Sequence, residues 1–374
     1  MSRCSARLLF SGERRLAFSL ASVRHLGFWL GVLLLFGLPG TAVARDSVNS
    51  DVPTASVRCK TDWMYRGMVG LSTHYFPLTV ASVESVADAF DVQRVANQAT
   101  EAGSAWFVFT LQHQNWLMMA PNGTFDRFVG HGDRTPERDV PLELFRALDA
   151  KGIKLLLYVN LYMSAAPAVT QAMGGWPPND QLVDRMAAVY REFSIRYGDK
   201  VAGWWVDGAG MPHYRNSPHR ERWFAKIAGA LRAGNPNAVV AISPALEVGR
   251  YSVDSDFTAG ESNDLKPIPA GRWLDGAQWH LWTYLGGWWG SNGKRFSDQE
   301  LGKYLALVTS RGGAITLDVG TWGVVRDGLK GDTAAVSEGG RIDPEQIVQI
   351  KRVREQHRLR SPSLSEPVPA CPAH

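Results

Sequence analysis

Residues 201–208 read VAGWWVDG, and this short run guides the interpretation of the rest of the chain. It is rich in the aromatic and β-branched residues that favour strands, and it is shorter than an ordinary helix. Its apolar residues do not alternate with polar ones, which is typical of a parallel strand buried on both faces. The run ends on the carboxylate of Asp207, and glycines follow as Gly208 and Gly210. We expect a buried strand that presents Asp207 to a space that the glycines keep open for a ligand.

Runs of the same kind recur along the chain. Seven more segments have the length and composition of strands: GMVGLSTHY (67–75), AWFVFTLQH (105–113), KLLLYVNLY (154–162), AVVAISP (238–244), SDFTAGE (255–261), AQWHLWTY (277–284) and AITLDVGT (314–321). Between them lie segments with apolar residues at steps of three and four, as in 181–198, which predict amphipathic helices. Eight strands alternating with helices predict an α/β fold, a (β/α)8 barrel of the TIM type. An open doubly wound sheet is the alternative, but no glycine fingerprint follows the first predicted strand.

The two ends of the chain differ from the middle. Residues 1–44 combine a basic leader, the apolar run GFWLGVLLLFGL (27–38) and the small residues of TAVA (41–44), which together predict a cleavable signal peptide. An uncleaved N-terminal anchor is the alternative. We expect residues 45–360 to form a single barrel domain and residues 361–374 a Pro/Ser-rich tail. The protein is then exported, to a periplasm or to the cell exterior, with no membrane attachment after cleavage.

The charge of the chain gives no argument for a nucleic-acid partner. There are 40 Lys and Arg residues against 36 Asp and Glu residues, a formal net charge of +4. Five of those basic residues and one acidic residue lie within residues 1–44, so the rest of the chain carries equal numbers of both signs. Proteins that bind nucleic acid usually present a clearly basic surface. We therefore expect neither nucleic acid nor an anionic membrane as a partner.

The cysteines are few and lie far apart. Cys4 belongs to the predicted signal peptide, which leaves Cys59 and Cys371 near the two ends of the mature chain. A closed barrel brings its ends together, and an oxidising compartment permits a disulfide, so we hypothesise that these two cysteines pair. Two independent thiols are the alternative. The sequence has no CxxC or HExxH spacing, and we expect no metal and no organic cofactor.

Polar side chains collect where the predicted strands end. They include His74, His113 and Asn160 after the first three strands, Asp207 after the fourth and Glu261 after the sixth. Barrel enzymes carry their active sites at this end of the strands. The chain also has 14 tryptophans, whose faces can stack on sugar rings. Two carboxyl groups beside tryptophans indicate glycoside hydrolysis, which uses one ionised and one protonated carboxyl.

The order of these motifs resembles that of the family-29 glycoside hydrolases, the α-L-fucosidases, over residues 63–325. The segments that carry the resemblance are GLSTHYFP (70–77), FTLQHQNW (109–116), ERDVPLELFRALDAKGIKLLLYVN (137–160), AGWWVDG (202–208), SDFTAGE (255–261), WHLWTYLGGWWGSN (279–292) and VTSRGGAITLDVGTWG (308–323). Each stands in the place that the family's own motif for that strand would occupy.

The resemblance implies a retaining mechanism with Asp207 as the nucleophile and Glu261 as the acid/base. We expect further residues to contact the sugar: His74, His113, Tyr158, Trp205, Arg250, Trp279, His280 and Trp289. The substrate implied is an oligosaccharide or glycoconjugate with a terminal α-L-fucosyl or related deoxy-sugar residue. The oligomeric state, the linkage and the aglycone are left open.

Several positions depart from the family's pattern. Gln112 replaces the first histidine of a paired motif, and His280 stands where many members carry a glutamate. The Glu-Trp pair that usually contacts fucose has no counterpart. Such changes remove hydrogen bonds by which a buried polar site discriminates between sugars. Two alternatives therefore remain beside the hypothesis of a fucosidase. One is a glycosidase of the same fold with another sugar or an endo-acting site, and the other is a carbohydrate-binding protein with a degenerate site.

Overall fold

The computed structural model describes residues 59–266, 268–321, 331–359 and 368–372. The chain divides into two units, and all of these residues belong to the larger one, Ala55–His374. The predicted signal peptide, residues 1–44, and most of the predicted tail, residues 361–374, lie outside the described residues. In the part of the chain that the structure describes, no helix is long and apolar enough to cross a membrane.

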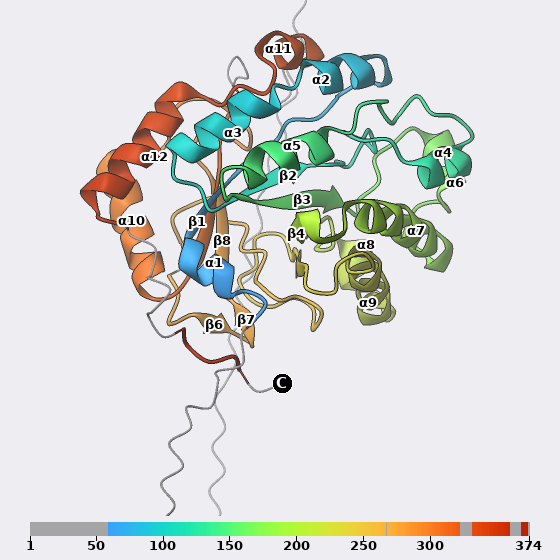
Figure 1. Ribbon diagram of the computed structural model, residues 1–374. Coiled ribbons are helices and arrows are strands. Elements are labelled where there is room, and N and C mark those ends of the chain that lie inside the picture. Colours follow the sequence, from blue (N-terminus) through green and yellow to red (C-terminus); the bar gives the residue numbers. More distant parts are fainter. Residues whose placement is uncertain (1–58, 267, 322–330, 360–367, 373–374) are drawn as a thin grey trace, which may run out of the picture. The chain divides into compact units, whose positions relative to one another are not determined.

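Seven parallel strands form one curled sheet (Figure 1). In spatial order they are β5 (Val239–Ile242), β4 (Val201–Asp207), β3 (Lys154–Asn160), β2 (Trp106–Thr110), β1 (Val69–Thr73), β9 (Ala314–Asp318) and β8 (His280–Tyr284). Each strand lies within a run that the sequence predicts as a strand, and all neighbours pair in parallel. Their carboxyl ends therefore meet at one end of the sheet, as the predicted (β/α)8 fold requires.

The sixth predicted strand, residues 255–261, is an exception because it forms no regular strand. Its backbone nevertheless joins the two edges of the sheet. Asp256 N–H donates to the carbonyl of Val240 in β5 at 2.8 Å, and the carbonyl of Asp256 accepts from Gln278 N–H at 3.0 Å. Isolated parallel bridges continue the contact with the β8 edge as far as Glu261. The α/β sheet thus closes into a barrel through this irregular segment.

A glycine explains why the sixth position is irregular. Gly260 has φ +67°, and a Cβ there would overlap the carbonyl of His280. The backbones of the two segments approach too closely for a side chain, so the strand bends at this point. A short antiparallel hairpin, β6 (Trp273–Leu274) and β7 (Ala277–Gln278), precedes β8.

Helices cover the outer side of the sheet, and the sequence periodicity predicts the longer ones. These are α3 (Val92–Glu101), α5 (Val140–Asp149), α7 (Asp180–Tyr197), α9 (Arg220–Leu231), α10 (Asp298–Ser310) and α12 (Pro344–Gln356). Figure 1 shows α10, α12, α3 and α5 following one another along this side. Asp91, Asp139, Asn179, Ser297 and Asp343 cap α3, α5, α7, α10 and α12, each accepting a backbone N–H of the first turn.

Shorter helices occur in the connections between these elements. They are α1 (Asp62–Gly67), α2 (Val83–Ala89), α4 (Gly123–Val129), α6 (Pro167–Ala172), α8 (Pro212–Arg215) and α11 (Gly331–Glu338), with 3-10 turns at Val80–Ser82 and Gly198–Lys200.

Two apolar cores lie on the two faces of the sheet. The adjacent residues Trp204 and Trp205 of β4 show the division, because successive strand residues point to opposite faces. Trp204 belongs to the core between sheet and helices, whereas Trp205 belongs to the core inside the barrel, with Trp106 and Trp282. Burying a large apolar side chain contributes roughly 1.5–3 kcal/mol to folding. Large rings therefore fill the barrel below its mouth.

The hypothesis of a Cys59–Cys371 disulfide is confirmed: the two Cα atoms lie 5.7 Å apart and the sulfurs are bonded. Neighbouring contacts hold the same part of the tail. Arg272, only 5% exposed, donates to the carbonyl of Pro369 at 3.0 Å and pairs with Asp62 at 2.7 Å. The bond spans 312 positions of sequence, so it ties the C-terminal segment to the start of the barrel.

We expect Cys371→Ser to lower the free energy of unfolding by about 2–5 kcal/mol, because the unfolded chain loses a very long covalent loop. Urea unfolding of the variant and of the wild type measures the difference. Reduced wild-type protein is the matched control and should unfold like the variant. Equal midpoints for variant and oxidised wild type would show that the bond adds no stability.

Candidate active site

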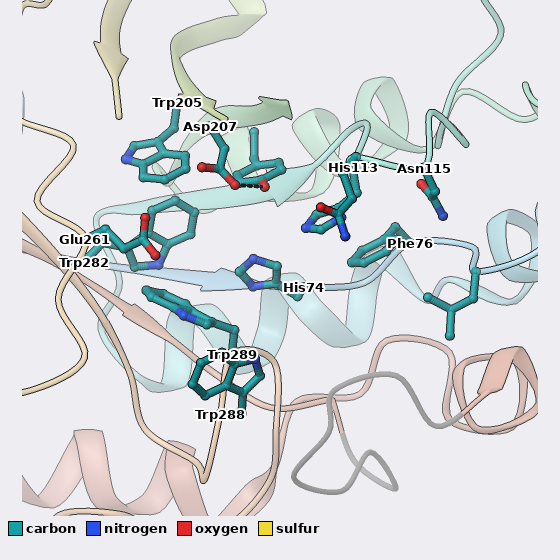
Figure 2. A pocket seen from close by; sticks show the side chains of 13 residues that line it. His74, Phe76, His113, Asn115, Trp205, Asp207, Glu261, Trp282, Trp288 and Trp289 are labelled. Carbon is teal, nitrogen blue, oxygen red and sulfur yellow. Dashed lines mark hydrogen bonds between the residues drawn. The ribbon is translucent and has the colours of Figure 1, made fainter. Parts of the chain in front are cut away.

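A pocket of about 360 Å³ opens at the carboxyl ends of the strands. Figure 2 shows Asp207 and Glu261 near one end of it, Phe76 and Asn115 near the other end, and His74 between them. The pocket is lined by His74, Phe76, Leu78, His113, Gln114, Asn115, Tyr158, Trp205, Asp207, Glu261, Trp282, Trp288 and Trp289. Its size is within the range of small-molecule sites, and its mixture of aromatic walls and a few polar groups is typical of them.

Asp207 is held by donors from its own strand end and from β3. The phenol of Tyr158 donates to Oδ2 at 2.5 Å, and Asn160 Nδ2 donates to the same oxygen at 3.0 Å. Gly208 N–H donates to Oδ1 at 2.6 Å. Burial and the nearby carboxylate raise the pKa of Tyr158 well above its usual value, so Tyr158 stays a neutral donor. The carboxylate is therefore fixed in one orientation at the pocket.

The glycines after Asp207 have a different role from the one expected. At Gly208, with φ +76°, a Cβ would lie 2.5 Å from Asn160 Oδ1 and 2.5 Å from Tyr162 N. At Gly210 it would lie 2.5 Å from the backbone of Pro244. The expectation that they keep space open for a ligand is wrong in detail: they let the chain turn closely against neighbouring strand ends.

Glu261 lies in the irregular segment that closes the barrel. Its pKa is raised to about 7, mainly by burial and then by the negative charge of Asp207. The positive charge of His74 and a hydrogen bond from Ser243 Oγ at 3.5 Å act in the opposite direction. Half of the Glu261 side chains therefore keep their proton at about neutral pH.

His74 lies in the middle of the pocket and is tied to a second carboxylate. Its Nδ1 is 2.9 Å from Asp318 Oδ2. Burial alone would lower the pKa of His74, but Asp318, together with Asp207 and Glu261, raises it above its usual value. With Nδ1–H directed to Asp318, Nε2–H is the second donor of the protonated ring. The surroundings of His74 thus favour its protonated form, a double donor beside the two carboxyl groups.

The pKa of His113 is shifted in the opposite direction. Burial, together with the positive charge of His74, lowers the pKa of His113 to about 3, so the ring is neutral. It stacks between Phe76, with ring centroids 4.3 Å apart, and Tyr158, with centroids 5.6 Å apart. A neutral imidazole offers one donor and one acceptor to a ligand.

Tryptophans form the apolar wall of the pocket. Trp205 and Trp282 meet edge to face with centroids 4.2 Å apart, and Trp289 meets Trp282 with centroids 5.6 Å apart. Their orientation is fixed by hydrogen bonds from Trp205 Nε1 to the carbonyl of Ala259 at 3.1 Å and from Trp282 Nε1 to Ser72 Oγ at 2.6 Å. Rings held in this way offer a preformed wall for an apolar face of a sugar.

The structure brings seven of the residues predicted for the site to this pocket: His74, His113, Tyr158, Trp205, Asp207, Glu261 and Trp289. Arg250 does not line it. The guanidinium donates to the carbonyls of Ser255 at 3.0 Å, Asp275 at 3.3 Å and Val253, so it braces its own loop.

Trp279 and His280 also lie outside the pocket lining. Trp279 points into the core between sheet and helices. His280 points into the barrel below the pocket, where its ring nitrogens contact the carbonyl of Thr258 at 3.0 Å and Thr316 Oγ1 at 2.7 Å. Burial lowers the pKa of His280 to about 4, so it is a neutral residue of the barrel interior. Position along the chain predicts that both lie near the pocket, but Trp279 points to the outer face of the sheet, and His280, the first residue of β8, lies below the pocket.

Several residues of the site are absent from the predicted set of site residues, although Asn160 is predicted to lie at a strand end. Trp282 lines the pocket, Asn160 donates to Asp207, and Asp318 partners His74. Asn160 and Asp318 are the last residues of β3 and β9, the same positional signal that selects Asp207. Gln112, where the family's pattern has a histidine, is fully buried and accepts from Asn160 N–H at 2.9 Å. It supports the strand end and does not face the pocket.

Among the described residues, no group of three or more His, Cys, Asp or Glu side chains is arranged to hold a metal ion. The chemistry available on the described part of the pocket is that of two carboxyl groups, two imidazoles, a phenol and indole rings. These groups can exchange protons and attack an electrophilic carbon.

A barrel with two carboxyl groups of contrasting environment among tryptophans at its mouth has the architecture of a glycoside hydrolase. A sequence model of one such family, described as alpha-L-fucosidase, matches residues 76–325. The chain belongs to the alpha-L-fucosidase family. No curated protein sequence matches it.

Solved structures of related enzymes have the same fold. The endo-fucoidan hydrolase MfFcnA4 from glycoside hydrolase family 107 is 17% identical, with a TM-score of 0.60 over 79% of this chain and 53% of its own. The alpha-L-fucosidase isoenzyme 1 from Paenibacillus thiaminolyticus is 18% identical, with a TM-score of 0.57 over 82% and 79%. An alpha-L-fucosidase from Bacteroides thetaiotaomicron is 13% identical, with a TM-score of 0.55 over 80% and 73%. This chain thus spans about half the length of the MfFcnA4 structure it matches.

We expect Asp318→Asn to lower the pKa of His74, because the imidazolium loses the negative charge that stabilises it. Titration of the His74 ring signals by NMR measures the shift. Asp343→Asn is the matched control. Asp318 accepts a hydrogen bond from Gly290 N–H, and Asp343, which is also buried, accepts one from Gly293 N–H in the same loop, at 2.7 Å. An unchanged His74 pKa in Asp318→Asn, or an equal shift in both variants, would contradict the pairing.

Proposed function

We propose that this protein is an exported retaining glycoside hydrolase that releases α-L-fucosyl or related deoxy-sugar residues from a glycan. The observation that carries the proposal is the contrast between two carboxyl groups in one pocket. Asp207 accepts three hydrogen bonds, whereas the pKa of Glu261 is raised to about 7. A retaining glycosidase needs one ionised carboxylate at the anomeric carbon and one protonated carboxyl at the leaving oxygen.

In the first step, an oxygen of Asp207 attacks the anomeric carbon. The bond from that carbon to the leaving oxygen breaks, and its electron pair stays on the oxygen. Glu261 transfers its proton to the same oxygen, so that the leaving sugar departs as a neutral alcohol. The products of this step are a glycosyl ester of Asp207 and the carboxylate of Glu261.

In the second step, the carboxylate of Glu261 takes a proton from water as the water oxygen attacks the anomeric carbon. The ester bond breaks, and its electron pair returns to Asp207. Two inversions at the same carbon give net retention of configuration. Both residues return to their starting protonation states, so the reaction balances without any other reagent.

The surrounding residues support these roles. The hydrogen bonds from Tyr158 and Asn160 orient Asp207 for attack and stabilise the charge that returns to it in the second step. His74, whose pKa is raised, lies close enough for its positive charge to oppose the rise in the pKa of Glu261, and it can donate Nε2–H to a sugar hydroxyl. The neutral His113 can accept or donate a second hydrogen bond.

The choice of sugar rests on family membership and on the walls of the pocket. Trp205, Trp282 and Trp289 offer an apolar surface that suits a deoxy sugar, which has one hydroxyl less than its parent. Export rests on the predicted signal peptide and on the Cys59–Cys371 disulfide, because disulfides persist mainly in oxidising compartments.

We expect Asp207→Ala to lower kcat for 4-nitrophenyl α-L-fucoside by about 10⁴-fold or more, and Glu261→Ala by about 10²–10⁴-fold. Azide should react with Asp207→Ala to give a fucosyl azide of inverted configuration, and with Glu261→Ala to give the retained product. Glu247→Ala, an exposed carboxylate paired with Arg215, is the control and should keep wild-type activity. Full activity in Asp207→Ala would refute the assignment. A folded wild type with no turnover would favour another sugar or a binding protein.

We expect kcat/KM for a substrate with a sugar leaving group to fall as the pH rises through about 7, because Glu261 must be protonated to act as the acid and loses its proton there. The charges facing Glu261 are Asp207 and His74. The pH profile of 2-chloro-4-nitrophenyl α-L-fucoside is the control, since that leaving group needs little protonation and should lose less activity. The same alkaline decline for both substrates would assign it to another group.

A further inference from the structure

One large aromatic side chain of the pocket is exposed to solvent. Trp288 is 47% exposed, and among the exposed large apolar side chains of the described residues it alone is aromatic. It lines the pocket that contains Asp207 and Glu261. An aromatic face beside a polar pocket can pack against an apolar face of a ligand while its polar edge stays hydrated. The exposed ring of Trp288 is therefore a candidate contact surface for a ligand.

The ring is exposed although its turn is firmly held by hydrogen bonds. Trp288 N–H donates to Ser291 Oγ at 2.7 Å, and Ser291 Oγ donates back to the carbonyl of Trp288 at 2.8 Å. Gly290 N–H donates to Asp318 Oδ1 at 2.5 Å, and Gln346 Nε2 donates to the carbonyl of Ser291 at 3.0 Å. These bonds fix residues 288–291 to the end of β9 and to α12. A preformed contact surface binds a ligand at a lower cost in entropy than a mobile one.

Neighbouring aromatic side chains pack against the ring at a tilt. Tyr284, the last residue of β8, contacts Trp288 with centroids 5.6 Å apart and Trp289 with centroids 5.0 Å apart. Arg295 covers Tyr284 with its guanidinium 3.7 Å from the ring centroid. Trp288 is thus the outermost member of an ordered cluster that begins in the barrel wall.

A continuous series of contacts leads from the proposed acid to this ring. Glu261 forms a backbone bridge with Trp282, Trp282 contacts Trp289, and Trp289 shares Tyr284 with Trp288. Figure 2 shows Trp289 and Trp288 one behind the other on the side of the pocket that begins at Trp282 and Glu261. The acid protonates the oxygen of the leaving group, so the leaving group departs along the side of the pocket where Glu261 lies.

We propose that Trp288 is the binding surface for the sugar residue that leaves, which stacks its apolar face on the exposed indole. The preferred substrate is then a saccharide in which the released residue is joined to a second sugar, and a small aglycone is a poor substitute. This inference rests on the proposed function for the identity of the acid.

The experiment compares two substrates that share the reacting sugar. α-L-Fucosyl fluoride has no sugar in its leaving group, whereas α-L-fucosyl disaccharides, tested as a panel of linkages and second sugars, place one there. The measured quantity is the ratio of kcat/KM for the best disaccharide to kcat/KM for the fluoride. We expect Trp288→Ala to lower this ratio about tenfold, which is the loss of about 1.4 kcal/mol of binding. Trp288→Phe keeps an aromatic face and should restore most of it.

Trp63→Ala is the matched control, because Trp63 is a partly buried tryptophan of α1 outside the pocket lining. An unchanged ratio in Trp288→Ala, or an equal fall in Trp63→Ala, would overturn the inference. Wild-type enzyme that cleaves neither substrate would instead contradict the proposed function. A glycan array would then test the site by itself, with binding of saccharides of two or more residues expected in the wild type and absent in Trp288→Ala. Binding that survives in Trp288→Ala would overturn the inference in that case as well.

Discussion

The parallel register between β3 and β4 is the constraint on which the site depends. It pairs Asn160 with Asp207 and Tyr158 with Trp205. Because these pairs are set by the backbone ladder, the amide of Asn160 and the phenol of Tyr158 reach the carboxylate of Asp207 without any long loop. A shift of one residue would turn each of these side chains to the opposite face of the sheet. The position of the carboxylate is thus set by the paired ends of β3 and β4.

The irregular sixth segment provides the second carboxyl in a different environment. A regular strand would hold its last residue by ladder hydrogen bonds, whereas Glu261 is held by an isolated bridge beside Gly260. Fewer donors reach Glu261 than Asp207, and burial therefore dominates its pKa. The irregularity that completes the barrel and the raised pKa that an acid catalyst requires have the same structural origin. Two carboxyl groups in one pocket have different hydrogen-bond environments because one lies in a strand and the other does not.

Local patterns in the sequence predict the strands, the longer helices and the residues at strand ends, since burial and periodicity are short-range properties. They do not predict which way a side chain points within an unbroken apolar run, so Trp204 and Trp205 look alike, as do Trp279 and His280. Local patterns also do not predict which residues far apart in the sequence contact each other. Asp318 meets His74 across 244 positions, and only the closure of the barrel brings them together. Arg250 fails as a prediction for the opposite reason, because its loop satisfies the guanidinium locally.

The departures from the family's pattern change how the pocket can select a sugar. Gln112 no longer faces the pocket and instead accepts from Asn160 N–H and from the phenol of Tyr190, 3.2 Å away. A hydrogen bond that a histidine would offer to the ligand is thereby exchanged for support of the strand end that holds Asp207. Sites that lose polar contacts discriminate less between similar sugars, since apolar contacts distinguish small changes by only about 1–3 kcal/mol. Selectivity then has to come from contacts outside the reacting ring, and the fixed, exposed indole of Trp288 lies where such contacts can form.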